Sequence, residues 1–509
     1  MERVDAAPTT SRSRAPLASI SVSVDFGKDR GQNLGSLFEA RDSQGRAFLG
    51  AGFVGVYNTL FRTDRHTLQF YFRPGEGGDQ FSIEPLPRPS EDAGAYLFDL
   101  DGALYAWGYV HDLAVRRWQG DRWEVDASFD RERIRLGDVR MRVGKGLLEL
   151  AQSTIRYEGK VVVPPPEEGA YHHLYYANGH LVFYHTEPER GRLLAVPWTP
   201  GDEAAADLAR ASVLTLKYAR ETTFSLGQLG REVLTCSNLG GLYAFAGTEW
   251  RILRAPDDRV SYQIYSMLNY YDRLLMAHYP SGTLYEYDGR QVRPLEGWPP
   301  VPPGVSASVR EAQTTTIYRG ELFVGVWPWG ELWRYDRDAN RWIAMGRLFR
   351  HPPLTDRVAH PYEQEIIDYN AANGTSLVHN DWGQRVTGMI PREDGLILAT
   401  SAKGPWQRDA RLGFLTDEVY AQYGAVHRLR LPGNLAVTIR RTDGPTRLRF
   451  VLERNRMAVF QDGRLLGETA LDPKLTAGLP KGHISWGQGI FGPLQGQLRS
   501  QTARWSSPP

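Results

Sequence analysis

The sequence predicts an all-β protein built from repeated four-stranded antiparallel sheets. The clearest copy spans residues 313–345, where four β-branched and aromatic runs of about five residues alternate with Gly, Pro or Asp-Asn turns. A shared phrase recurs at Gly241, Gly282 and Gly330: glycine, at most one residue, Leu-Tyr or Leu-Trp, one residue, then Tyr or Phe. Long helical periodicity is scarce. Because one such sheet cannot bury both of its faces, the copies are expected to pack as blades of a β-propeller.

Seven blades are predicted over residues 19–435, with six or eight as alternatives. Their innermost strands begin near residues 32, 94, 170, 222, 262, 313 and 384. The expected strands are 34–40, 47–53 and 66–72 in the first blade; 95–100, 103–109, 114–118 and 123–127 in the second; 171–176, 180–186 and 193–198 in the third; 223–226, 232–235 and 241–245 in the fourth; 266–269, 273–278 and 282–289 in the fifth; and 384–390, 396–400 and 425–431 in the seventh. Residues 131–163 contain two or three further strand-like runs, which form either an insertion or an extra blade.

The two ends of the chain differ from the repeats. Residues 1–18 are polar and rich in Arg, Ser and Pro, so we expect them to be disordered, and they do not form a signal peptide as they stand. The last part, 436–509, is predicted to be a small β-module with strands at 435–440, 448–453, 457–461, 483–489 and 496–503. Its phrase from Met457 to Gly467 is similar to the strand, Asp-Gly turn, strand of laminin-G or concanavalin-like sheets. The module is expected either to brace the propeller or to form a small sheet of that kind.

Composition restricts the classes of partner. The net charge is +1 over 509 residues, which argues against nucleic acid or an anionic membrane surface as the main partner. No run approaches the roughly 18 apolar residues that a membrane-spanning helix needs. Cys236 is the only cysteine, so a disulfide within the chain is excluded. We expect a soluble monomer.

Polar and aromatic residues gather where the first strands start and the second strands end. In a propeller these positions emerge on one face, which we call the rim face. Half of the twelve histidines, counting His379, fall there. Flat rings can stack on sugar faces, and Asn, Gln, Arg and His can bond hydroxyl and carboxylate groups, so the rim face is predicted to bind a carbohydrate. The predicted substrate-binding residues are His111, His173, Asn238, His278, Tyr279, Trp327, Trp329, Asp381 and Trp382.

The densest cluster lies on the hairpin of the third predicted blade. Tyr171, His172 and His173 face Tyr184 and His185 across that hairpin, and directly opposed side chains of adjacent strands lie about 5 Å apart. Strand alternation sends His172 and His173 to opposite faces of the sheet, so at most one of them should point to a given ligand. Arg220 opens the next blade. The predicted catalytic residues are His172, Tyr184, His185 and Arg220.

These residue types suit β-elimination at a uronic acid. The C5 proton next to the carboxylate is weakly acidic, so a cation must neutralise the carboxylate, a His or Tyr must take the proton, and another must protonate the leaving oxygen. Ordinary glycoside hydrolysis needs a pair of carboxylates. Asp381 is the one strong acid found at the rim, with Asp112 near the edge, which favours elimination.

Each of these observations also has a structural explanation. A histidine near a strand end is often a packing residue, two or three histidines on one hairpin could hold a structural metal, and Trp327 and Trp329 could cap the channel instead of stacking on sugar.

The His-rich strands, together with the stretch from Asp25 to Asn33 that reads Asp-Phe-Gly-Lys-Asp-Arg-Gly-Gln-Asn, resemble the seven-bladed β-propeller polysaccharide lyases. That group includes ulvan lyases and lyases that cleave L-rhamnose from glucuronate at the ends of plant gums. The resemblance implies a His or Tyr base, an acidic polysaccharide or its chain end as substrate, no required cofactor, and at most a bound Ca2+ as a structural or supporting ion. It also implies a secreted or periplasmic protein. A glycoside hydrolase and a non-catalytic glycan-binding propeller remain the alternatives.

Overall fold

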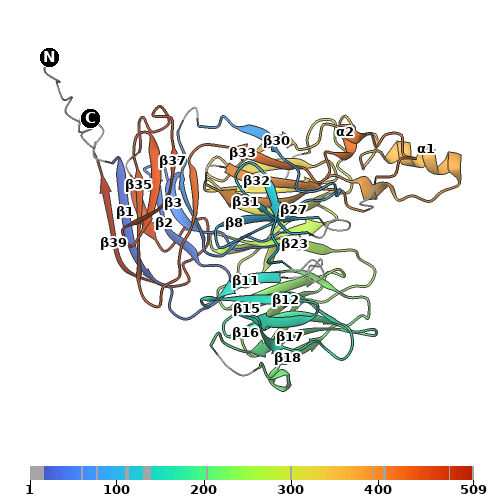
Figure 1. Cartoon of the computed structure of the whole chain (residues 1–509), viewed down its shortest axis with the longest axis horizontal. Coiled ribbons are helices and arrows are strands. Elements are labelled where there is room, and N and C mark those ends of the chain that lie inside the picture. Colours follow the sequence, from blue (N-terminus) through green and yellow to red (C-terminus); the bar gives the residue numbers. More distant parts are fainter. Residues whose placement is uncertain are drawn as a thin grey trace, which may run out of the picture.

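The chain forms a seven-bladed β-propeller joined to a two-sheet β-sandwich (Figure 1). The computed structural model describes residues 16–58, 61–75, 78–108, 114–129, 139–201, 205–298, 301–393, 395–404, 408–480 and 482–506. The predicted all-β propeller fold is therefore confirmed, as is the count of seven blades.

Each blade is an antiparallel sheet of four strands, and we name the blades A to G in chain order. Blade A has β7 (Tyr96–Leu100), β8 (Ala103–Trp107), β9 (Arg116–Trp118) and β10 (Trp123–Val125); blade B has β11 (Val139–Val143), β12 (Gly146–Ala151), β13 (Thr154–Tyr157) and β14 (Lys160–Val163); blade C has β15 (Ala170–Ala177), β16 (His180–Thr186), β17 (Gly191–Pro197) and β18 (Ser212–Thr215). Blade D has β19 (Thr223–Leu229), β20 (Glu232–Ser237), β21 (Leu242–Phe245) and β22 (Trp250–Arg254); blade E has β23 (Gln263–Tyr270), β24 (Arg273–Tyr279), β25 (Leu284–Tyr287) and β26 (Val292–Pro294). Blade F has β27 (Glu311–Tyr318), β28 (Glu321–Trp327), β29 (Glu331–Asp336) and β30 (Arg341–Arg347); blade G has β31 (Arg385–Arg392), β32 (Gly395–Ser401), β33 (Val426–Arg430) and β6 (Ser82–Leu86).

The ring is closed by an N-terminal strand. β6 precedes blade A in the chain but pairs with β33 as the outermost strand of blade G, with Ile83 opposite Leu429. Innermost strands of successive blades contact one another from β11 around to β31, and β31 contacts β7. Between blades A and B, the ion pair of Arg142 with Asp101 and the packing of Leu147 against the blade A cluster cross the junction.

The central channel is filled by the chain itself. The plug, by which we mean the described residues 54–58 and 61–66, enters the channel, where β4 (Val56–Asn58) pairs antiparallel with the inner edge of β23. Asn58 Nδ2 donates to the carbonyl of Gln313 in blade F at 2.7 Å, and Tyr57 packs on Tyr175 of blade C. The plug thus occupies the channel between blades C, E and F.

The sandwich consists of two five-stranded antiparallel sheets that enclose their own apolar core. One sheet has the order β37 (Arg464–Ala470), β36 (Arg456–Gln461), β35 (Thr446–Leu452), β1 (Ala18–Asp25) and β39 (Gln497–Trp505); the other has β34 (Asn434–Thr438), β5 (Thr67–Phe72), β3 (Ala47–Phe53), β2 (Gly35–Asp42) and β38 (Gly482–Trp486). Between the sheets, Phe38 meets Phe450 edge to face, and Phe70 packs on Phe450 with its ring tilted.

Two sequence predictions need correction here. The strands predicted at 34–40, 47–53 and 66–72 as the first blade form β2, β3 and β5 of the sandwich, where β2 pairs with β38 and β5 with β34. Residues 131–163 were left open as an insertion or an extra blade; of these, 131–138 lie outside the described residues, and 139–163 form the complete blade B, which keeps the count at seven. The C-terminal strands were predicted close to their observed places, but they build the sandwich jointly with residues 18–72. In the sequence, the propeller blades thus extend from 82 to 430. They lie between the N-terminal and C-terminal strands that together build the sandwich.

The sandwich covers the propeller face that carries the turns between first and second strands. There Arg319 and Asn434 are hydrogen-bonded, as are Arg73 and Asp338. The rim face points away from the sandwich, and the long connections with α1 (Glu363–Asn373) and α2 (Asp417–Tyr420) extend from that side (Figure 1). In the part of the chain that the structure describes, no helix is long and apolar enough to cross a membrane.

Candidate functional site

Five successive blades carry the same irregularity near the rim face. In blades C to G the first strand has one extra residue relative to the second, which makes a β-bulge one residue after the strand's first rim-side pairs. The residues at the bulge are His173, Phe224, Tyr265, Gln313 and Thr387. Bulges redirect side chains and are frequent next to binding sites, so this repeated feature indicates where the propeller presents its ligand-facing residues.

Aromatic rings form a continuous arc at this level. The ring centroids of His172 and His173 are 6.2 Å apart, those of His173 and Phe224 6.5 Å, and those of Phe224 and Tyr265 5.9 Å. Tyr265 lies 6.5 Å from Tyr279 of the neighbouring strand. We call these five residues, from blades C, D and E, the aromatic arc. Most of them are half-buried, so one edge of the arc is open to solvent.

The arc ends at a group of charged residues on blades F and G. Lys403 Nζ lies 4.8 Å from the centre of the Tyr279 ring, 4.0 Å from that of Trp327 and 2.5 Å from Glu311 Oε1. Arg385 Nη2 lies 3.7 Å from Glu311 Oε2. The Glu311 side chain is fully buried, whereas Lys403 remains partly exposed. We call Glu311, Arg385, Lys403 and Asp381 the charged cluster.

Asp381 completes this cluster. Its backbone carbonyl accepts hydrogen bonds from Lys403 N and Gly404 N at 3.0 and 2.8 Å, and its carboxylate lies so close to Gly404 that a Cβ there would meet Oδ1 at 2.1 Å. Burial raises the pKa of Asp381, although Lys403 and His379 oppose the shift. Burial lowers the pKa of Lys403, and Glu311 opposes that shift.

The buried amide of Gln313 adds an unused polar group. Neither its Oε1 nor its Nε2 has a hydrogen-bond partner among the described residues, although the side chain is completely buried. Gln313 occupies the same bulge position as Tyr265 in the preceding blade. Because buried amides are normally hydrogen-bonded, this one is available to a ligand or a water molecule.

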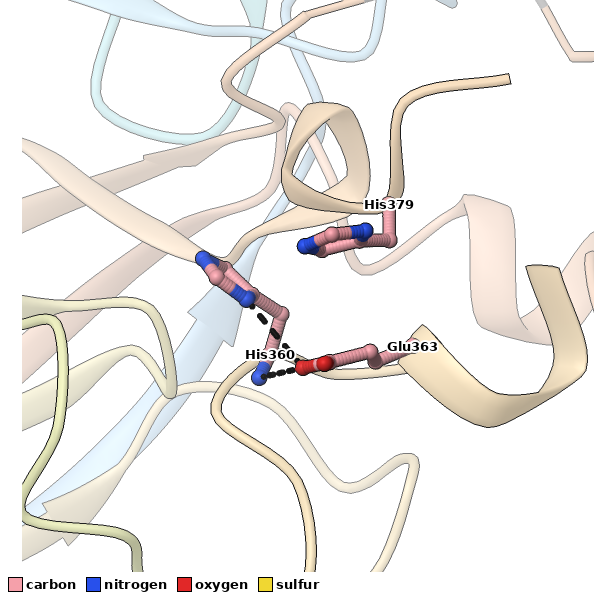
Figure 2. A group of neighbouring side chains, drawn as sticks. All are labelled: His360, Glu363 and His379. Atoms are coloured by element: carbon pink, nitrogen blue, oxygen red, sulfur yellow. Dashed lines mark hydrogen bonds and ion pairs between the residues drawn. The ribbon is translucent and has the colours of Figure 1, made fainter. Parts of the chain in front are cut away.

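A second group of polar side chains lies beside the charged cluster. His360, Glu363 and His379 offer ligand atoms that all lie within 4.8 Å of one another, as Figure 2 shows. The His360 ring is 5.0 Å from that of Trp327. Burial lowers the pKa of His360, while Glu363 opposes the shift.

The four predicted catalytic residues do not converge. The predicted opposition across the hairpin is confirmed, since Tyr171 pairs with His185 and His172 with Tyr184. However, Tyr184 is buried and its hydroxyl donates to the carbonyl of Glu221 at 2.8 Å.

The other two catalytic predictions also have structural partners. His185 Nε2 bonds the carbonyl of Glu168 at 2.9 Å, and the exposed Arg220 guanidinium donates to the carbonyl of Asp258. Only His172 of the four lies in the aromatic arc. The expectation that His172 and His173 point to opposite faces is wrong, because the bulge and the left-handed backbone of His173, with φ of 57°, interrupt the alternation.

The predicted substrate-binding residues divide into two groups. His173 and Tyr279 lie in the arc, Asp381 lies in the charged cluster, and Trp327 contacts both Lys403 and His360. The residues of the second group have structural contacts. They are Asn238, which bonds Thr222 N and the Arg220 carbonyl; His278, which is buried against Tyr262 and Ser281; Trp329, which is buried and donates to the Ala359 carbonyl; and Trp382, which packs on Tyr423. His111 lies outside the described residues.

Several residues of the site were not predicted from the sequence. The statement that Asp381 is the one strong rim acid is wrong, because Glu311 is also at the rim. β27 starts at Glu311, two residues before the start predicted at Gln313, so the prediction did not include Glu311 among the residues at the rim face. Phe224 and Tyr265 were missed because a bulge leaves no periodic signal in sequence. His360 and Glu363 lie in a long connection whose length was the available signal.

A cavity of about 880 Å³ lies on the opposite side, between the sandwich and the turns of blades B, C and D. Its lining includes Lys28, Arg30, Arg231 and Arg441. The stretch from Asp25, on which the resemblance to polysaccharide lyases partly depends, therefore lines this junction and not the rim face.

Comparisons with known proteins give only distant similarities. No family model matches the sequence, and no curated protein matches it. Among solved structures, YCF48 bound to D1 peptide aligns with a TM-score of 0.38 at 10% identity, over 70% of this chain and 98% of that one. The PQQ-bound aldose sugar dehydrogenase of Streptomyces coelicolor gives 0.28 at 12% identity, over 70% and 99%. BamB of Moraxella catarrhalis gives 0.27 at 10% identity, over 64% and 96%.

Proposed function

We propose that the protein is a lyase that cleaves an acidic glycan next to a uronic acid, with its active site on the rim face of blades C to G. The observation that carries the proposal is the continuity of the aromatic arc with Lys403 and Arg385. Half-exposed rings suit the apolar faces of sugar units, and the cations suit a carboxylate at the end of the same surface. The proposed active site therefore lies at the end of the arc next to blades F and G. The sequence had predicted it on the hairpin of the third predicted blade, at the opposite end.

The cluster residues supply each part of a β-elimination. Lys403 and Arg385 neutralise the uronate carboxylate, which acidifies C5–H. A base removes the C5 proton, the C4–C5 double bond forms as the C4–O4 bond breaks, and an acid protonates O4. We assign the base to Tyr279, whose ring centre lies 4.8 Å from Lys403 Nζ, and the acid to Asp381, whose pKa is raised by burial.

The presence of two carboxylates supports a second candidate, a glycoside hydrolase. Glu311 and Asp381 both lie next to Lys403, and a pair of carboxyl groups is what hydrolysis requires. Glu311 is, however, already paired with Lys403 and Arg385 and fully buried, which fits a positioning role better than contact with a sugar.

The test is to incubate the purified protein with uronate-containing glycans, including gum arabic and ulvan, and to follow ultraviolet absorbance and reducing ends together. An eliminase raises both signals, because its product carries an unsaturated uronate. Tyr279→Phe and Asp381→Asn are expected to lower kcat by roughly 100-fold or more with the fold intact, since each removes a proton-transfer group. Lys403→Met is expected to raise KM for the acidic substrate as well as lower kcat.

Arg259→Ala is the matched control, because Arg259 is exposed on the same face and pairs only with Asp257 of its own loop among the described residues. Reducing ends without ultraviolet absorbance would favour the hydrolase. Loss of elimination in Arg220→Ala but not in Tyr279→Phe would return the site to the third-blade hairpin and contradict our assignment. Saturable glycan binding with neither signal would identify a binding protein.

A further inference from the structure

The connection between blades F and G, residues 348–384, brings three metal-ligand side chains together from two separate places. His360 and Glu363 lie at the start of α1, and His379 begins the short helix η3 (His379–Trp382). α1 spans most of the sequence between them. The cluster therefore brings the start of α1 next to the start of η3, on the rim face.

The geometry of the three side chains is that of a cation site. His360 Nδ1 and Glu363 Oε2 are 3.2 Å apart, the two imidazole centroids are 4.8 Å apart, and the ligand atoms of all three lie within 4.8 Å of one another. In Figure 2 the His379 ring lies over the Glu363 carboxylate, and one of its nitrogens is on the side that faces His360. A cation placed among these atoms would be reached by all three ligands with only small side-chain adjustments.

The Glu363 carboxylate has unused bonding capacity. Glu363 Oε2 accepts hydrogen bonds from Ala359 N, His360 N and His360 Nδ1, whereas Oε1 accepts none from the described residues. Nδ1 is the ring nitrogen of His360 that faces this carboxylate, so it is the His360 atom available to an ion shared with Glu363.

We propose that His360, Glu363 and His379 bind one divalent transition-metal ion of the zinc type. Two imidazoles and one carboxylate suit Zn2+ or Co2+, whereas Ca2+ prefers sites made of oxygen ligands only. The expectation of a supporting Ca2+ is thus replaced, at this place, by a different class of ion. The proposal does not depend on the lyase assignment, because it follows from the three ligands alone.

Three protein ligands leave at least one position of a tetrahedral site for water or a bound ligand. Trp327, in ring contact with His360, also contacts Lys403, so the ion would lie next to the charged cluster. The ion would also fix α1 and η3 to each other, which would stabilise the connection against the rim.

The test uses the untagged full chain, stripped with chelator and titrated with Zn2+ by calorimetry and with Co2+ by visible absorption. We expect one ion per chain, a cobalt d–d spectrum with nitrogen ligation, and a higher Tm with Zn2+ than in chelator. His379→Ala and Glu363→Gln should each weaken Zn2+ binding by roughly 100-fold or more. The glutamine keeps an acceptor oxygen for the backbone amides at the start of α1, so this variant is expected to fold even if the alanine variant does not.

His351→Ala is the control, because His351 is in the same connection but exposed, and its charged neighbour is Glu418 at 4.0 Å. It should bind Zn2+ as the unaltered protein does, and Ca2+ should give no saturable heat with any variant. Absence of 1:1 Zn2+ binding would overturn the proposal. So would a folded Glu363→Gln variant with unchanged affinity and cobalt spectrum.

Discussion

Asp99 is a carboxyl group enclosed where the plug passes blade A. It is 4% exposed, and it accepts hydrogen bonds from Asp64 N at 2.6 Å and Thr67 Oγ1 at 2.7 Å. Burial, reinforced by the nearby Asp64, raises its pKa to about 7. The plug is therefore docked against a group that changes charge close to neutral pH.

We expect Asp99→Asn to flatten the pH dependence of stability. The folded protein holds the Asp99 proton up to about pH 7, whereas the unfolded chain releases it near pH 4. This group's contribution is therefore complete below about pH 4 and is lost as pH rises toward 7, by up to about 1.4 kcal/mol per pH unit. Asn cannot titrate, and its Oδ1 can still accept a hydrogen bond.

The measurement is the free energy of unfolding in urea from pH 4.5 to 8 for both proteins. The variant should gain stability relative to the unaltered protein as pH rises, and the difference should level off above pH 7. Parallel pH profiles would show that Asp99 is ionised in the folded protein across this range.

At the scale of elements, β6 holds the ring closed through a short strand pairing. Ile83 and Leu86 are half-buried against the core of blades E to G, and Glu84 bonds Arg430 at 3.1 Å. No covalent link supports this junction, since Cys236 is a free, buried cysteine. Ring stability should therefore depend strongly on the two apolar side chains of β6.

The double change Ile83→Asp, Leu86→Asp is expected to release β6 and destabilise the propeller by roughly 3 kcal/mol or more, because two apolar contacts are replaced by charge. Hydrogen exchange should accelerate in β33, the partner strand, while β35 and β36 of the sandwich keep their protection. Glu84→Gln, which changes only an exposed ion pair, should cost less than about 1 kcal/mol. Equal exchange in β33 for both variants would mean that other contacts close the ring.

Local patterns in the sequence predicted the blades but not every pairing. The meander of residues 313–345 was found because its four strands are consecutive and separated by turn residues. Residues 47–53 gave the same signal, yet β3 is buried on both faces in the sandwich. The pattern of apolar residues in a strand does not identify the strand that pairs with it. For example, β5 pairs with β34, which is distant in sequence.

The same distinction applies to the site. Rim residues such as Tyr279 and Asp381 were found because strand ends place them on one face. Phe224 and Tyr265 depend on a bulge, and the His360–Glu363–His379 cluster depends on the folding of a connection, so neither follows from periodicity.

At the scale of the molecule, Asp29 joins the sandwich to the propeller. It forms a buried pair with Arg65 of the plug at 2.6 Å, accepts from Gly144 N of blade B at 2.5 Å, and lies 3.7 Å from Arg441 of the sandwich. The side chains of Arg65 and Asp29 are 1% and 5% exposed. The relative position of the two units thus depends on a pair that is shielded from solvent.

We expect Asp29→Asn to lower stability by about 3–5 kcal/mol, since it leaves the buried Arg65 without its carboxylate. Calorimetry should show a lower Tm and, as the two units uncouple, two transitions in place of one. Asp443→Asn is the matched control: it breaks the exposed pair with Lys145 at the same junction and should cost less than about 1 kcal/mol. Similar effects of the two changes would show that burial of the Asp29 pair does not matter.

The split composition of the sandwich has a consequence for synthesis. The ribosome releases β1, β2, β3 and β5 first, then translates the entire propeller, and only afterwards supplies β34 to β39. Until then the apolar faces of Phe38, Leu49 and Phe70 have no second layer to cover them. The plug, which lies between β3 and β5 in the chain, can enter the ring only while the blades assemble around it. The nascent protein must therefore keep an uncovered sheet from aggregating until its last strands emerge.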